Sequence, residues 1–218
     1  MKIYPTNMRF CDYVWKKQLS KGVVKPEAQQ RLIAVQNHSL LYGFINKTLN
    51  GIQRIDEHRK FILQESFNLT PQKLIVNTDI DFKNLTPTRR PLKVFRGISY
   101  AEHMTPQKNK MYNKAISLKK GDKIRMAEYA YSSEDRNYAN MFSSSKNGIN
   151  YTIIVPQGAR VSRVSVSKNG IYDEVVFPRN SEFECTEHSI DKNSNHNILL
   201  RYIPPQEPWR KFNNQNKL

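Results

Sequence analysis

Residues 150–185, NYTIIVPQGARVSRVSVSKNGIYDEVVFPRNSEFEC, decide the fold class of this chain. Two short apolar runs in this stretch, YTIIV and EVVF, are each followed by proline, and Asn169-Gly170 marks a turn between them. Short runs rich in β-branched residues and bounded by turn residues are typical of strands. The runs LKVF, from Leu92, and NILLRYI, from Asn197, repeat the pattern. We therefore expect the chain over 91–205 to be mostly sheet.

The first 90 residues have a different pattern. From Pro26 to about Phe67 apolar residues recur at helical spacing, with a turn at Asn50-Gly51. We expect two or three helices there, then a polar connection over 75–91, and a tail over 206–218 at the end of the chain. Neither half holds much core by itself, so we predict one α+β domain over 1–218, with the N-terminal helices packed on a core of two small β-sheets.

Composition restricts the classes of partner. The chain carries 35 Lys and Arg against 19 Asp and Glu, a formal net charge of +16, which favours nucleic acid, an anionic membrane or an acidic protein surface as partner. Its 11 Tyr and 10 Phe indicate a folded chain, because basic disordered chains have few aromatic residues. Two cysteines fit neither a disulfide framework nor a four-ligand zinc site. We expect a soluble protein without a membrane span or a classical signal peptide.

Three segments carry residues that suit catalysis. In LKVFRGIS, Arg96 can present a planar fork to a phosphate, and Gly97 allows close approach of a ligand. In YAYSSEDRNYANMF, Ser133 can cap a helix over 134–142, and in IYDEVVFP, Glu174 leads an apolar strand. Each feature also has an ordinary structural interpretation: a surface arginine, a helix cap, and an exposed glutamate at a strand end.

The order and spacing of these segments resemble the bacterial NAD-dependent mono-ADP-ribosyltransferase toxins with the Arg-Ser-Glu signature, similar to the enzymatic domains of clostridial binary toxins. LLYGFINKTLNG is similar to the family's helix before a glycine, and LKVFRGIS to its first core strand. LKKGDKI with YAYSS, followed by Ala139 and Phe142, resembles the strand and helix that hold Ser-Thr-Ser. VPQGA and EVVFPRNSEF resemble the Pro-x-Gly turn and the strand of the final glutamate.

The resemblance implies roles for individual residues. Arg96 would bind the phosphates or ribose of NAD, Gly97 would offer its backbone to the nicotinamide amide, and Glu174 would be the catalytic carboxylate. The residues aligned with the family's Ser-Thr-Ser and with its conserved helix position complete the predicted site: Tyr131, Ser132, Ser133 and Phe142.

This chain departs from the family's pattern at two positions. Tyr131 stands at the first serine, where its hydroxyl can still donate a hydrogen bond from a different distance, or its ring can stack on the nicotinamide. Tyr172 stands two residues before Glu174, where relatives have Glu or Gln that engages the acceptor. We predict that Tyr172 contacts the acceptor, and its presence argues against the arginine-modifying pattern.

The resemblance implies a mono-ADP-ribosyltransferase that acts as a toxin or effector, with NAD as substrate and no metal. We expect a monomer that acts in the cytoplasm of the producing cell or is delivered into a target cell. We expect its macromolecular acceptor to be a protein or, as second choice, RNA or DNA. The basic charge would suit a nucleic-acid acceptor, but we favour simple solvation of that charge. Two alternatives stay open: an NAD glycohydrolase, in which water replaces the acceptor, and a catalytically weak protein that binds NAD or nucleic acid.

Overall fold

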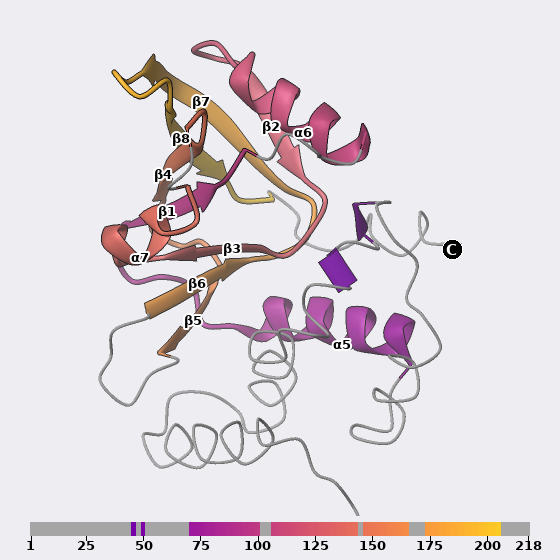
Figure 1. Cartoon of the computed structure of the whole chain (residues 1–218). Coiled ribbons are helices and arrows are strands. Elements are labelled where there is room, and N and C mark those ends of the chain that lie inside the picture. Colours follow the sequence, from indigo (N-terminus) through magenta and orange to yellow (C-terminus); the bar gives the residue numbers. More distant parts are fainter. Residues whose placement is uncertain are drawn as a thin grey trace, which may run out of the picture.

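The computed structural model describes residues 45–46, 49–50, 70–100, 106–143, 146–165 and 173–205 of the 218-residue chain. Figure 1 shows the helices and strands of this part. In chain order they are α5 (Pro71–Asn84), β1 (Leu92–Ile98), α6 (Pro106–Ile116), β2 (Lys123–Met126), β3 (Ala130–Ser133), α7 (Arg136–Asn140), β4 (Ile149–Val155), β5 (Ser162–Ser165), β6 (Asp173–Phe177), β7 (Ser181–Ile190) and β8 (His196–Ile203).

The eight strands form one mixed sheet in the order β2-β7-β8-β4-β1-β3-β6-β5. Neighbouring strands run antiparallel except β4 and β8, which are parallel. The predicted α+β class is confirmed. The two expected sheets are instead two parts of one hydrogen-bonded sheet, because β1 pairs with β4 along its whole length but with β3 only at Phe95 and Ser133.

The main core lies between this curved sheet and α6. Alternate residues of the strands point into it, as the burial of Ile149, Tyr151, Ile153 and Val155 along β4 shows. Side chains of α6 and the following turn, including Tyr112, Ala115 and Leu118, close the cluster. The runs LKVF, YTIIV, EVVF and NILLRYI therefore form β1, β4, β6 and β8, as their composition predicts.

Helix α5 packs on the other face of the sheet, beneath β5 and β6 (Figure 1), and makes a second, smaller core. Leu74, Ile75 and Phe82 of α5 contact Tyr129 and Val176 in this cluster. The helix covers much of the segment that we expected to be a polar connection over 75–91, so that expectation is wrong. The buried stripe of α5 includes a threonine and two aspartates, which hides its amphipathic pattern.

The cap of α7 also differs from the prediction. Asp135, not Ser133, is the N-cap, because its carboxylate accepts hydrogen bonds from the backbone N–H groups of Asn137 and Tyr138. The hydroxyl of Ser133 accepts a hydrogen bond from the backbone N–H of Asp135 instead. Ser133 therefore ends β3 and fixes the turn into the helix, with its side chain beside β6.

The predicted helices between Pro26 and Phe67 lie almost wholly outside the described residues. Within that range Ile45, Asn46 and Leu49 are helical. The predicted tail over 206–218 lies outside the described residues as well. The assignment of the chain to a single domain stays a prediction.

Candidate active site

Three neighbouring strands, β1, β3 and β6, carry most of the residues predicted for the site (Figure 1). Phe95 of β1 lies opposite Ser133 of β3, and Ser133 lies opposite Glu174 of β6. Since strands are spaced by about 4.8 Å, the backbones of Phe95 and Glu174 lie roughly 10 Å apart, and Arg96 directly follows Phe95. The fold thus brings into one region an arginine, a serine and a glutamate that are far apart in the sequence.

Arg96 lies where β1 and β3 separate. Its Nη1 donates a hydrogen bond to the carbonyl oxygen of Tyr131, and its Nη2 donates to Oε1 of Glu128, both at 2.9 Å. The backbone of β1 pairs with β3 only at Phe95 and Ser133, and the guanidinium of Arg96 supplies a hydrogen-bond donor to the carbonyl oxygen of Tyr131 on β3. The side chain of Arg96 is 15% exposed and that of Glu128 is 6% exposed. The fork predicted to meet phosphate therefore already binds protein groups at both terminal nitrogens.

Glu174 is a partly buried carboxylate on β6. Removal from water disfavours the charged form and raises the pKa of this carboxyl from 4.5 to about 7. Its Oε2 is buried without a hydrogen-bond partner. Among the described residues this state is rare and is shared only by Nε of Arg96 and Oε2 of Glu128. A buried carboxylate oxygen without a partner is costly, and such groups are typical of sites that bind a ligand.

The two serines of β3 have different environments. The hydroxyl of Ser132 donates a hydrogen bond of 2.7 Å to the carbonyl oxygen of Val175, so this side chain ties β3 to β6. Ser133, the direct neighbour of Glu174 across the strands, points to the same face as that carboxylate. Ser133 is therefore the serine that the register places next to the predicted catalytic residue.

Tyr131 occupies the position at which the family's first serine was expected. Its side chain packs against the second core cluster, and it lies opposite Val176. Tyr131 and Ser133 are two residues apart in β3, so their side chains point to the same face of the sheet, which is also the face of Glu174. The tyrosine thus borders the site, and its backbone carbonyl anchors Arg96.

Gly97 has a packing reason to be glycine. A Cβ atom at this position would lie 2.2 Å from the backbone oxygen of Ala139 and 2.9 Å from the backbone nitrogen of Ser143. The side where a side chain would stand is therefore filled by α7 and the turn after it. The backbone of Phe142, in that same turn, lies beside Gly97, and its ring is 52% exposed while making an edge-to-face contact with Tyr138.

Sequence reasoning missed Glu128, Asp79 and Arg179. Arg179 and Asp79 form a buried ion pair, with Nε–Oδ2 and Nη2–Oδ2 distances of 2.8 and 2.7 Å. The hydroxyl of Tyr129 donates a hydrogen bond of 2.9 Å to Oδ1 of the same aspartate. Single charged residues carry no periodic signal, so nothing in the sequence pattern pointed to these contacts.

Asn46, which belongs to the LLYGFINKTLNG motif, contacts the residue before β3. Its side-chain amide donates to the carbonyl oxygen of Tyr129 at 2.9 Å and accepts from the N–H of Tyr129 at 3.1 Å. One amide thus satisfies both backbone groups of the residue that precedes β3. Asn46 therefore supports the residue that leads into the strand at the centre of the site.

Tyr172, predicted to contact the acceptor, lies outside the described residues. Among the described residues no group of three or more His, Cys, Asp or Glu side chains could hold a metal ion. In the same part of the chain, no helix combines the length and apolar character that crossing a bilayer requires.

No family model matches the sequence, and no curated protein sequence is similar to it at a significant level. Solved structures do match. Exoenzyme S of Pseudomonas aeruginosa, solved with human 14-3-3 protein beta and bound to carba-NAD, is 14% identical, with a TM-score of 0.60 over 90% of this chain and 88% of that chain.

Two further structures show the same likeness. C3larvin toxin, an ADP-ribosyltransferase of Paenibacillus larvae, is 16% identical, with a TM-score of 0.54 over 88% of this chain and 92% of that chain. The C3 exoenzyme of Clostridium limosum is 16% identical, with a TM-score of 0.56 over 93% of this chain and 98% of that chain. The chain therefore has the fold of the bacterial mono-ADP-ribosyltransferase toxins, as the sequence motifs predict.

Proposed function

We propose that this chain transfers ADP-ribose from NAD to a macromolecular acceptor and releases nicotinamide. The observation that carries the proposal is the desolvated carboxylate of Glu174, one oxygen of which has no hydrogen-bond partner. Glu174 lies on β6, next to Ser133 on β3, and Arg96 lies on β1 at the other side of β3. The shared fold and the carba-NAD bound to exoenzyme S support NAD as the substrate.

Glu174 has the properties that the reaction requires. Breaking the bond between nicotinamide and ribose leaves positive charge on the anomeric carbon and ring oxygen, as in glycoside hydrolysis. The bond's electron pair leaves with the nicotinamide, and an acceptor nucleophile then bonds to the anomeric carbon and loses its proton. A fixed carboxylate stabilises the developing charge and accepts a hydrogen bond from a ribose hydroxyl. The positive charge of bound NAD on its nicotinamide ring favours the ionised form of this carboxyl.

The other residues would bind and orient NAD. Arg96 would direct its guanidinium toward the phosphates or ribose, and Gly97 would offer backbone groups to the nicotinamide amide. Ser133 would position Glu174, and Ser132 would hold β3 against β6 through its bond to Val175. The exposed ring of Phe142 would pack against the substrate next to Gly97. Tyr172 would contact the acceptor.

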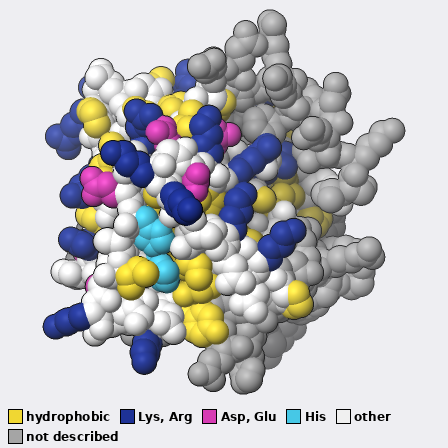
Figure 2. Space-filling model, turned by 90° about the horizontal axis from the view of Figure 1, so that it is seen from above, with side chains coloured by type: hydrophobic (Ala, Val, Ile, Leu, Met, Phe, Trp, Pro, Cys, Tyr) yellow, Lys and Arg dark blue, Asp and Glu magenta, His cyan; other side chains and the backbone are white. Residues whose placement is uncertain are grey.

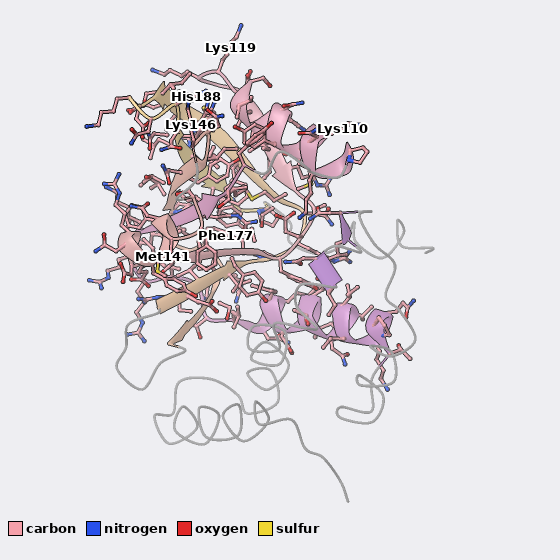
Figure 3. All side chains as sticks on the ribbon, viewed as in Figure 1. Lys110, Lys119, Met141, Lys146, Phe177 and His188 are labelled. Atoms are coloured by element: carbon pink, nitrogen blue, oxygen red, sulfur yellow. The ribbon has the colours of Figure 1, made fainter. Side chains whose placement is uncertain are left out.

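We rank a protein acceptor before RNA or DNA. Figure 2 shows Lys and Arg side chains spread over the described face rather than gathered in one groove. Lys110 of α6 and Lys119 of the following turn point away from the body of the molecule (Figure 3), and both are exposed. This charge favours anionic partners in general but marks no nucleic-acid track. A soluble toxin or effector that acts inside a cell is consistent with the neighbours of this fold.

The test uses NAD labelled in its adenylate half, incubated with the protein and a cell lysate. Label on a polymer that protease removes indicates a protein acceptor, and label that nuclease removes indicates nucleic acid. Free labelled ADP-ribose without labelled polymer indicates an NAD glycohydrolase. Glu174→Gln should reduce all of these activities by about 10²- to 10³-fold. Glu182→Gln, a carboxylate in an exposed ion pair with Lys123, is the matched control and should retain them. Without nicotinamide release from the wild-type protein, the proposal fails.

A further inference from the structure

The ion pair between Arg96 and Glu128 is incomplete in a specific way. A guanidinium and a carboxylate commonly pair through two parallel N–H···O bonds. Here only Nη2 of Arg96 and Oε1 of Glu128 are joined, at 2.9 Å. The neighbouring Nε–H donor and Oε2 acceptor are both buried and have no partner. The pair therefore leaves one N–H donor, on Arg96, and one oxygen acceptor, on Glu128, without a hydrogen-bond partner; we call these the open atoms.

The protein holds these open atoms in place. The second terminal nitrogen of Arg96 is bound to the carbonyl oxygen of Tyr131, so the guanidinium is fixed at both ends. Glu128 is 6% exposed in its side chain, and the ionised arginine beside it keeps a countercharge in contact. Binding at the open atoms breaks no existing hydrogen bond, because neither atom has a partner.

We infer that Arg96 and Glu128 form one recognition element that holds a ligand group with one hydrogen-bond acceptor and one donor. Nε of Arg96 donates to the ligand's acceptor, and Oε2 of Glu128 accepts from the ligand's donor. This inference rests on the proposed function and adds Glu128 to the substrate site. Because the charge of Glu128 offsets that of the guanidinium, Arg96 would recognise its ligand through a directional hydrogen bond and not through net charge.

In the nicotinamide nucleoside half of NAD, which the proposed function places beside Gly97 and Glu174, two groups have this chemistry. The primary amide of nicotinamide has a carbonyl acceptor and an NH₂ donor, and a ribose diol has a hydroxyl of each role. A bare phosphate has acceptors but no donor at neutral pH, so the negative charge of Glu128 opposes it at this place. The element therefore fits the nicotinamide nucleoside half of NAD better than its diphosphate.

The test compares wild type with Glu128→Gln, which keeps the size of the side chain and an oxygen for Nη2 but replaces the open acceptor with a donor. Glu182→Gln serves as control. For each protein, KM and kcat for nicotinamide release from NAD are measured. Inhibition constants are measured for nicotinic acid adenine dinucleotide, which lacks the amide donor, and for NAD analogues that lack a hydroxyl of the nicotinamide ribose. Thermal unfolding of each variant checks the fold.

We expect Glu128→Gln to raise KM for NAD by about tenfold while kcat stays within about threefold, because one charge-assisted hydrogen bond to the bound substrate is lost. If the amide is the group, the variant loses the wild-type preference for NAD over the acid analogue. If a ribose hydroxyl is the group, the variant loses its sensitivity to the matching deoxy analogue. A merely structural role of Glu128 would move neither selectivity.

An unchanged or lower KM in Glu128→Gln, with every analogue preference intact, would overturn the inference even though the enzyme is active. Should Glu128→Gln fail to fold, Glu128→Asp takes its place. Aspartate keeps the charge but shortens the reach, and it is expected to raise KM with the acid analogue still excluded. A wild-type protein that neither turns over nor binds NAD would refute the proposed function itself, which is a different result.

Discussion

Replacing Glu174 with glutamine should make the protein more stable at neutral pH and inactive. The structure holds this carboxyl largely out of water, with one oxygen lacking a partner and a pKa raised to about 7. Glutamine has the same size and no charge, so the desolvation cost of the ionised form disappears. The same change removes the negative charge that the proposed chemistry needs. Stability and activity should therefore move in opposite directions.

The size of the stability gain follows from proton linkage. The unfolded chain releases the proton of Glu174 near pH 4.5, whereas the folded protein holds it until about pH 7. Between these values the folded state binds more protons, so the wild-type protein loses stability as the pH rises through this window. A difference of 2.5 pH units (7 minus 4.5) is equivalent to about 3 kcal/mol, and partial exposure of the side chain reduces it to about 2 kcal/mol.

Urea unfolding of both proteins at pH 5 and pH 8 measures this effect, because every other titrating group cancels in the difference between them. The gain of Glu174→Gln over wild type should be larger at pH 8 than at pH 5 by about 2 kcal/mol, or about 4–8 °C in Tm for a chain of this length. Nicotinamide release should fall by about 10²- to 10³-fold, the usual cost of removing one preorganised electrostatic group.

The wild-type kcat/KM should rise as the pH increases through about 7, because the ionised carboxyl is the active form in the free enzyme. Equal stability differences at pH 5 and pH 8 would show that Glu174 is not desolvated. Retention of full nicotinamide release in Glu174→Gln would exclude Glu174 from the chemistry. The first result would refute the desolvation of Glu174, and the second would refute its catalytic role. Each result can occur without the other.

Other substitutions test the frame around the site. Gly97→Ala places a methyl group 2.2 Å from a backbone oxygen of α7, so we expect a loss of about 2–3 kcal/mol in urea unfolding, and a neutral result would contradict the close packing. Arg96→Ala should raise KM for NAD at least tenfold and destabilise the fold by about 3 kcal/mol, because it leaves Glu128 buried without its countercharge. Arg179→Ala should cost about 3–5 kcal/mol in the same assay, since Asp79 remains buried, and Arg179→Ala/Asp79→Ala should recover part of that loss.

Much of the sheet was predictable because its strands are encoded locally. Apolar, β-branched runs such as those of β1 and β4 are bounded by turn residues, and this signal does not depend on distant contacts. Helix α5 was not predictable in this way. Its buried face includes Thr78, Asp79 and Asp81. The hydroxyl of Thr78 donates a hydrogen bond to the carbonyl oxygen of Leu74 in the same helix, whereas Asp79 is tolerated there because Arg179 of another segment pairs with it.

The candidate site divides in the same manner. Arg96, Ser133 and Glu174 could be proposed because each belongs to a segment with a recognisable motif, and the register places these segments on neighbouring strands. Glu128 could not be proposed, because one glutamate in a turn has no pattern and its role depends on Arg96, 32 positions earlier. The packing reason for Gly97 was also hidden, since it depends on the path of the chain after α7.

The Arg96–Glu128 pair and the hydrogen bond between Tyr129 and Asp79 both hold strand β3 in place. Glu128 and Tyr129 are consecutive residues immediately before β3, and they anchor it in two directions: Glu128 to Arg96 of β1, and Tyr129 to Asp79 of α5. Strand β3 has only one pair with β1 and is four residues long, so its ladder bonds alone hold it weakly on that side. Buried, charge-assisted bonds at its entrance compensate for this short pairing. Because Ser133 at the end of the same strand lies next to Glu174, a displacement of β3 would move the serine away from the carboxylate. The rigidity of the proposed site therefore depends in part on Tyr129 and Asp79, for which no substrate contact is proposed.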